Sequence, residues 1–295
     1  MRTRILNKMT AQEVEDYLAR GGDTIFLAMG VVEVHGECPV DCETIIPEAM
    51  AIELAEQADG LALINLPYFY PGGTVISNAT VHITILEGIE YLLKILHSLA
   101  DQGFRRFYIV NGHGPSALTA NAAIWDFFDE TRFHVCDLGL INMQVKASQK
   151  AGKPFDMRDS GLDYMTYGAY KMLGQLDYIP IKPDAKEERG EHLSTDPAMT
   201  KFLNLYRDFA GYGATAQIFS DPREHGGGMI FKSREDLERV ADEGIKRIKE
   251  LASSVNIQEL NEALKVYQDY VVEVCEKYPR VKPTSKGGRN ENQNL

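Results

Sequence analysis

The chain has 295 residues, of which 44% are hydrophobic and 25% are charged, as is usual for a globular protein. Acidic residues outnumber basic ones by 43 to 31, and the formal net charge of −12 would repel a phosphate backbone. Nucleic acid is therefore not expected as a partner. The apolar runs are far shorter than the roughly 20 residues that span a bilayer, so no membrane span is expected either.

The cysteines and the N-terminus indicate a cytoplasmic protein. The four cysteines, at positions 38, 42, 136 and 275, form no CxxC pair and no regular framework, which favours reduced thiols. The basic N-terminal segment lacks the apolar stretch and the cleavage site of a signal peptide. Cys38 and Cys42 stand out because both lie within a polar segment described below.

Helices and strands alternate along the first half of the chain. Thr10-Ala11-Gln12-Glu13 has the pattern of a capping box, which predicts a helix that ends near Arg20 before two glycines. Short apolar runs bounded by turn residues predict buried strands, and longer periodic segments predict helices. We expect strands at 24–29, 61–66, 107–110 and 133–136, and further helices at 47–57, 85–102 and 116–129.

The second half is less regular. From about residue 140 to residue 230 no clean periodicity appears, whereas Ser233 is followed by a helical pattern to about Ser253 and a second one from 258 to 276. The alternation predicts an α/β protein, a three-layer αβα sandwich with a mostly parallel central sheet. We expect one domain over residues 1–282 and a flexible polar tail over residues 283–295.

A cluster of metal-binding side-chain types follows the first predicted strand. Within eleven positions the chain offers carboxylates and an imidazole that together suit a divalent cation, at Glu33, His35, Glu37, Asp41 and Glu43. Glu33 and His35 are two residues apart, so in extended backbone both side chains point to the same face. A solvated acidic loop with one hydrogen-bonded histidine is the alternative.

A second motif follows the third predicted strand. Asn111-Gly112-His113-Gly114 places glycines on both sides of a histidine, which allows a sharp turn and a close approach of the ring to a ligand. Ligands of open α/β sheets bind beyond the carboxyl ends of the strands, so this motif and the segment at Glu33 are expected to meet. A structural turn with an incidental histidine is the competing interpretation.

In these segments the sequence resembles the creatininase (creatinine amidohydrolase) family. The resemblance covers roughly residues 10 to 250 and is most specific in Glu33-Val34-His35-Gly36, Gly103-Phe104-Arg105-Arg106 and Asn111-Gly112-His113-Gly114. It implies a site for two divalent metal ions (Zn, Mn or Fe), with Glu33, His35 and His113 as ligands. It also implies a shared carboxylate, for which Glu43 is preferred to Asp41.

The chain departs from the family pattern in two places. The segment from Cys38 to Glu43 is one residue shorter, and Cys38 stands at or beside a family histidine. We interpret Cys38 as a substrate-binding, pocket-lining thiol, with a soft metal ligand and simple packing as alternatives. In Glu188-Arg189-Gly190-Glu191-His192 the family's histidine is replaced by Glu188. Here Glu191 is the expected fifth metal ligand, and Glu188 or His192 is the expected catalytic acid or base.

The remaining expectations concern substrate and assembly. Tyr70 and His225 are further substrate-binding candidates, the latter in a glycine-rich loop that resembles a late loop of the family. The resemblance implies a metal-dependent hydrolase that attacks a carbonyl of a small cyclic substrate, and a homo-oligomer, commonly a hexamer. The bond is a cyclic amide C–N bond or a ring C–C bond of a diketo-inositol such as 3-dehydro-scyllo-inosose. A non-catalytic metal-binding or small-molecule-binding protein is the alternative.

Overall fold

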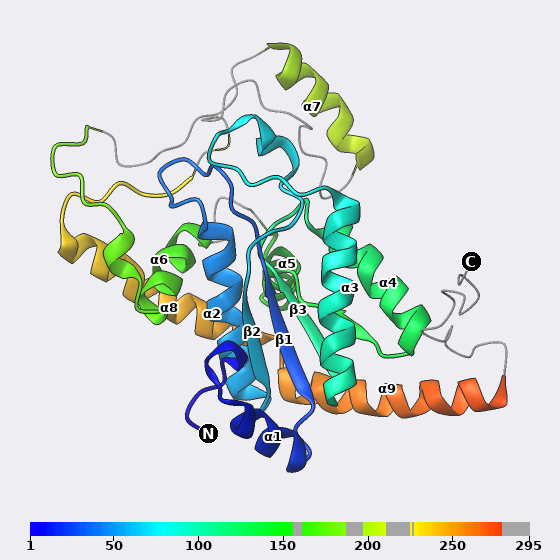
Figure 1. Ribbon diagram of the computed structural model, residues 1–295. Coiled ribbons are helices and arrows are strands. Elements are labelled where there is room, and N and C mark those ends of the chain that lie inside the picture. The colour runs from blue at the N-terminus through cyan, green and yellow to red at the C-terminus, as the bar shows by residue number, and fades with distance from the viewer. Residues whose placement is uncertain (156–160, 187–196, 211–224, 226, 279–295) are drawn as a thin grey trace, which may run out of the picture.

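A parallel β-sheet forms the middle layer of the computed structural model, which describes residues 1–155, 161–186, 197–210, 225 and 227–278 (Figure 1). The strand order is β2-β1-β3-β4, and every pairing is parallel. The strand bounds are β1 (Thr24–Met29), β2 (Leu61–Leu66), β3 (Arg106–Asn111) and β4 (Val135–Asp137). Met29 pairs with Asn111, so β1 and β3 end side by side.

Helices cover both faces of this sheet. Figure 1 shows α2, α6 and α8 on one side and α3 and α4 on the other, with α9 across the lower end. The helix bounds are α1 (Ala11–Ala19), α2 (Cys42–Gln57), α3 (Ile85–Gln102), α4 (Ala117–Thr131), α5 (Leu140–Lys150), α6 (Leu162–Met172), α7 (Pro197–Ala210), α8 (Arg234–Ser254) and α9 (Ile257–Lys277). The predicted three-layer α/β sandwich is thereby confirmed.

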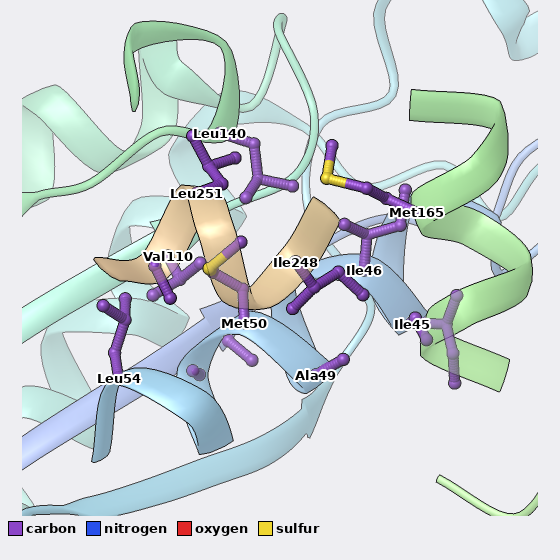
Figure 2. Close-up of a cluster of buried hydrophobic side chains, with 14 of the residues drawn as sticks. Ile45, Ile46, Ala49, Met50, Leu54, Val110, Leu140, Met165, Ile248 and Leu251 are labelled. Carbon is purple, nitrogen blue, oxygen red and sulfur yellow. The ribbon is translucent and has the colours of Figure 1, made fainter. Parts of the chain in front are cut away.

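Each face of the sheet has its own hydrophobic core because side chains alternate along a strand. From β1, Phe26 and Ala28 join the cluster formed with α2, α6 and α8, part of which Figure 2 shows. Ile25 and Leu27 join the opposite cluster with α3 and α4. Burial on both faces explains why β1 is a continuous apolar run.

Local sequence signals set several helix ends. Thr10 and Glu13 form the predicted capping box of α1, and Thr84 and Glu87 form another at α3.

The expected start of α2 near Pro47 is wrong, because the helix begins at Cys42 and Pro47 lies inside it. Proline is common at the first helical position, which misplaced the start. The consequence is that Glu43 lies in the first turn of a helix.

The sheet has a switch point between β1 and β3. From β1 the chain crosses to β2 on one side and then returns to β3 on the other. In open α/β sheets the crevice beyond the carboxyl ends of the strands at such a point is where ligands bind. The segments that follow β1 and β3 therefore start at the ligand-binding edge of this fold.

Within the described residues no helix is long and apolar enough to cross a membrane. The two C-terminal helices contribute Ile248, Leu251, Ile257 and Leu264 to the same core as α2. That packing supports the single domain predicted over residues 1–282, which stays a prediction. The predicted tail, residues 283–295, lies outside the described residues.

Candidate metal centre

Three segments bring carboxylates and imidazoles together at the switch point. Glu33 and His35 lie in the loop after β1, Glu43 lies in the first turn of α2, and His113 follows β3. His225 joins them from a distant part of the chain, with its Nε2 atom 3.1 Å from Glu33 Oε1. Of the predicted ligands, Glu33, His35, Glu43 and His113 are thus gathered in one place.

The first donor group consists of Glu33, Glu43 and His113, whose ligand atoms lie within 4.8 Å of one another. Glu33 is fully buried at 0% exposure. His113 Nδ1 lies 3.3 Å from Glu33 Oε1 and is in close contact with Glu43 Oε2. Two carboxylates therefore face the same ring nitrogen, as they would around one divalent cation.

The orientation of His113 is set by the backbone. Its Nε2 atom lies 3.2 Å from the carbonyl oxygen of Pro71. A carbonyl only accepts hydrogen bonds, so Nε2 carries the proton and, in the neutral ring, Nδ1 holds the lone pair. Metal-binding histidines commonly have such a partner on the second nitrogen. The geometry thus presents Nδ1 of His113 as the donor atom.

The second donor group consists of His35, Glu43 and His225, again within 4.8 Å of one another. His35 Nε2 lies 3.7 Å from Glu43 Oε1, and the rings of His35 and His225 meet edge to face with centroids 4.6 Å apart. Glu43 belongs to both groups through its two oxygens. It is therefore placed as a carboxylate shared between two cation positions would be.

The protonation of these groups reflects their burial and their charges. Burial raises the pKa of Glu33, and the neighbouring Glu43 carboxylate raises it further. Although burial opposes the ionised form of Glu43, the charge of His113 holds the pKa of Glu43 well below its usual value. Burial also opposes the imidazolium form of His113, but Glu43 more than offsets this and the pKa of His113 is raised.

Thr74 is a contact that sequence reasoning missed. It lies in the short 3-10 helix Gly72–Ile76, and its hydroxyl donates a hydrogen bond to Glu33 Oε2. Such a bond orients a ligating carboxylate and leaves its other oxygen directed at the cluster. Sequence reasoning singled out Tyr70 in this loop as a substrate-binding candidate, but nothing in the sequence indicated the contact between Thr74 and Glu33.

Gly112 explains how His113 reaches Glu43. A Cβ atom at position 112 would lie 2.3 Å from the carbonyl oxygen of Glu43 and 2.8 Å from the Pro47 ring. Only glycine lets the end of β3 approach the first turns of α2 this closely. At Gly114 a Cβ atom would meet nothing within 4 Å, so the close approach depends on the first glycine of the motif.

Asp41, the competing candidate for the shared carboxylate, has a different partner. The hydroxyl of Tyr170 in α6 donates a hydrogen bond to Asp41 Oδ1. Burial and the Asp41 charge raise the pKa of Tyr170, which keeps it a hydrogen-bond donor. Among the described residues, Glu43 is in a donor group with histidines and Asp41 is not.

Two buried thiols adjoin the cluster. Cys38, Cys42 and His35 form a third group of possible ligand atoms within 4.8 Å of one another. The Cys38 sulfur lies 3.9 Å from the hydroxyl of Tyr167. Hydrogen bonding from the Cys42 thiol, the largest cause, lowers the pKa of Cys38 to about 6, which favours the thiolate form of this sulfur.

The other predicted site residues are placed as follows. Tyr70 is partly buried, with its ring 6.3 Å from that of His82, and it precedes the residue whose carbonyl contacts His113. His225, predicted to bind substrate, lies among the nitrogen and oxygen donors of the cluster, and its role in substrate binding stays a prediction. Glu188, Glu191 and His192 lie outside the described residues.

The donor set fits divalent cations. It combines carboxylate oxygens with imidazole nitrogens, the set that zinc, manganese and iron accept. Glu33 and His113 are buried, His35, Glu43 and His225 are partly buried, and the set lies at the ligand-binding edge of a parallel sheet. A three-layer α/β sandwich with such a cluster is the architecture of a metal-dependent hydrolase.

Comparisons with known proteins agree. A family model described as Creatininase, creatinine amidohydrolase, matches residues 7–162. The chain therefore belongs to the creatininase family. No protein in the search of curated proteins matched the chain.

Solved structures of creatininases share the fold. The structure of a creatininase with Mn has a TM-score of 0.57 and 20% identity, covering 88% of this chain and 99% of that one. A mutant creatininase of the Zn-Zn type has a TM-score of 0.56 and 20% identity, over the same shares of the two chains. A Bacteroides fragilis protein described as a creatinine amidohydrolase has a TM-score of 0.55 and 18% identity, covering 85% of this chain and 98% of that one.

Proposed function

We propose that the chain uses two divalent cations to hydrolyse a bond next to a carbonyl group in a small cyclic substrate. The observation that carries the proposal is the position of Glu43, whose carboxylate is common to a group with Glu33 and His113 and a group with His35 and His225. Two cations held by these side chains would lower the pKa of a water molecule and polarise a carbonyl group. Creatininase structures with Mn and with two Zn support a metal of this kind.

Some residues of the chain would bind the cations, and others would orient those ligands. Glu33 and His113 hold one position, His35 and His225 hold the other, and Glu43 joins them. The Pro71 carbonyl fixes the ring of His113, and Thr74 fixes the carboxylate of Glu33. This support matters because a metal-ligand set that is about 1 Å out of place loses most of its catalytic benefit.

Further parts of the proposal rest on the sequence. Glu191 is proposed as an additional ligand, and Glu188 or His192 as the group that supplies a proton to the leaving atom. Cys38 and Tyr70 are proposed to line the substrate pocket. A mutant creatininase has been solved in complex with creatine, which supports a small molecule as the substrate.

The substrate proposal has two branches, hydrolysis of a cyclic amide C–N bond and of a ring C–C bond in a diketo-inositol such as 3-dehydro-scyllo-inosose. In the second branch the leaving carbanion is stabilised as an enolate, so an amine-protonating histidine is less necessary. The replacement of the family histidine by Glu188 supports that branch. Assays of metal-loaded protein on both substrate classes separate the branches, and metal binding without turnover of either would favour a non-catalytic binding protein.

The metal centre is tested by a matched pair of variants. We expect Glu43→Gln to lose Mn²⁺ binding by more than the roughly 10- to 100-fold that loss of an outer-shell partner costs. Asp41→Asn, two residues away and directed at Tyr170, is expected to retain it. Metal content after dialysis and calorimetric titration are the measurements. Equal metal binding by wild type and Glu43→Gln would refute the shared-carboxylate site.

We also propose that the protein is a cytoplasmic homo-oligomer, a hexamer by family resemblance. Exposed apolar side chains on described helices support an interface, namely Leu86 on α3 and Leu118 and Trp125 on α4, with Trp125 70% exposed. Trp125→Glu is expected to reduce the assembly without unfolding the chain. Sedimentation velocity measures this, with Lys249→Glu on the exposed face of α8 as the control. A wild-type monomer would contradict the proposal.

A further inference from the structure

Cys38 and Cys42 are two buried thiols, and the proposed hydrolysis uses neither sulfur as a metal ligand. Both sulfur atoms lie within 4.8 Å of a ring nitrogen of His35 and of each other. Cys38 is in the loop after β1 and Cys42 is the first residue of α2, so the start of this helix holds the pair together. The two thiols and His35 therefore form a second set of possible ligands beside the carboxylate cluster.

Among the described residues, each of the three donor groups shares at least one residue with another group. Glu43 is common to the two carboxylate-containing groups, whereas the thiol group shares only His35 with any other. No group unites the two sulfurs with Glu43 or His225 within the same limit. The thiols therefore form a donor group distinct from the two carboxylate-containing groups, and His35 is the residue that links it to them.

The two ring nitrogens of His35 have different surroundings. Its Nε2 atom lies 3.7 Å from Glu43 Oε1. Its Nδ1 atom is buried and has no hydrogen-bond partner in the part of the chain that the structure describes. A buried nitrogen without a partner is costly, and a ligand that it contacts removes the cost.

Two successive glycines cover this side of the site. A Cβ atom at Gly227 would lie 2.7 Å from His35 Nδ1, and one at Gly228 would lie 2.7 Å from the Cys38 sulfur. The same dipeptide therefore closes over the free nitrogen and over a sulfur. It is held in place because the Gly227 carbonyl accepts a 3.0 Å hydrogen bond from the Glu37 backbone amide.

We infer that His35, Cys38 and Cys42 form a separate binding position for a thiophilic divalent cation, Zn²⁺ foremost, beside the carboxylate centre. Two sulfurs and one imidazole are a known zinc ligand set that leaves a fourth coordination place open. Thiolates select zinc over manganese, which prefers oxygen ligands. This inference rests on the proposed function in one respect, because His35 belongs both to the thiol group and to the group with Glu43 and His225.

The test uses the full-length protein, reduced, stripped of metal and then loaded with Co²⁺ as a spectroscopic substitute for Zn²⁺. We expect the thiolate-to-cobalt charge-transfer absorption in the wild type and its loss in Cys38→Ser and in Cys42→Ser. Cys275→Ser in α9, remote from the site, is the matched control and keeps the absorption. Circular dichroism establishes that each variant is folded.

The wild-type spectrum decides the matter even if a cysteine variant does not fold. Bound Co²⁺ without thiolate absorption would overturn this inference and leave the carboxylate centre intact. No bound Co²⁺ at all would overturn both. Absorption that persists in both cysteine variants would also overturn the inference.

Glu43→Gln distinguishes two positions from one. In this variant we expect the cobalt–thiolate absorption to remain while cation binding at the carboxylate centre is lost. Loss of the thiolate absorption together with the carboxylate centre would overturn the claim of a separate position. Competition supplies a second measure, since Zn²⁺ is expected to displace Co²⁺ from the thiols and Mn²⁺ is not.

Discussion

At His113 a proton and a divalent cation compete for the same nitrogen. The pKa of His113 is raised above its ordinary value of 6.5, because the Glu43 and Glu33 carboxylates outweigh the effect of burial. Metal binding requires neutral imidazole, so we expect the affinity for Zn²⁺ to fall as the pH drops through this raised pKa. Calorimetric titration between about pH 5 and 8 measures the effect.

The metal-free protein has the opposite dependence. A raised folded-state pKa means that His113 contributes stability that is fully present below the unfolded value of 6.5 and is lost as the pH rises through the folded value. Denaturant unfolding of metal-free protein across the same range checks the sign. Zn²⁺ affinity that is independent of pH would contradict the role of His113.

Individual residue types were predictable at the site, but their partners were not. The types and spacing at Glu33, His35 and His113 indicated metal ligands because carboxylate and imidazole donors rarely cluster after a buried strand without reason. Thr74 and the Pro71 carbonyl have no such signal. A hydroxyl or a backbone carbonyl acts there only because a loop far away in sequence lies beside the cluster.

At the scale of elements, the metal centre depends on the close approach of β3 to α2. In Gly112→Ala the added Cβ atom would lie 2.3 Å from the Glu43 carbonyl oxygen, so we expect a loss of unfolding free energy of about 1–3 kcal/mol. Gly114→Ala has nothing within 4 Å and is expected to be neutral or to stabilise by up to about 1 kcal/mol.

Urea unfolding and metal content together measure this pair of variants. Gly112→Ala is expected to lose stability and metal affinity together, because the strain acts on the backbone that carries Glu43. If both alanine variants behaved alike, the close approach of the two elements would not be the reason for glycine at position 112.

Elements with strong local signals were predicted to the residue, namely β1, β2 and α3. Each has an uninterrupted apolar or periodic pattern between turn residues. The start of α2 was wrong by five positions because Pro47 suggested a first turn, whereas packing of Ile45 and Ile46 against α6 and α8 extends the helix to Cys42 (Figure 2). Tertiary contacts outweighed a local preference there.

At the scale of the whole molecule, the ligands tie distant parts of the chain together. They come from the loops after β1 and β3, from α2 and from residue 225. A cation bound only by the folded state stabilises all of these at once, by about 2.7 kcal/mol at a metal concentration 100 times the Kd. We expect Zn²⁺ or Mn²⁺ to raise the Tm of the wild type.

Differential scanning calorimetry with and without metal measures this shift, with Glu43→Gln as the reference variant. The shift caused by Mn²⁺ is expected to disappear in Glu43→Gln and to persist in Asp41→Asn, whose carboxylate lies with Tyr170. The shift caused by Zn²⁺ is expected to become smaller in Glu43→Gln, because the thiol position remains. An equal rise in all three proteins would mean that the metal acts elsewhere on the chain.

The sequence by itself determined the α/β class, the parallel sheet and the two motifs at strand ends, because hydrophobic periodicity and turn residues act locally. It also indicated the creatininase family, to which the chain belongs. Only the tertiary structure decided that Glu43 and not Asp41 faces the histidines, that His225 joins them, and that Cys38 and Cys42 lie close to His35. These choices depend on how loops and helix starts pack at the switch point of the sheet, and no local pattern encodes that packing.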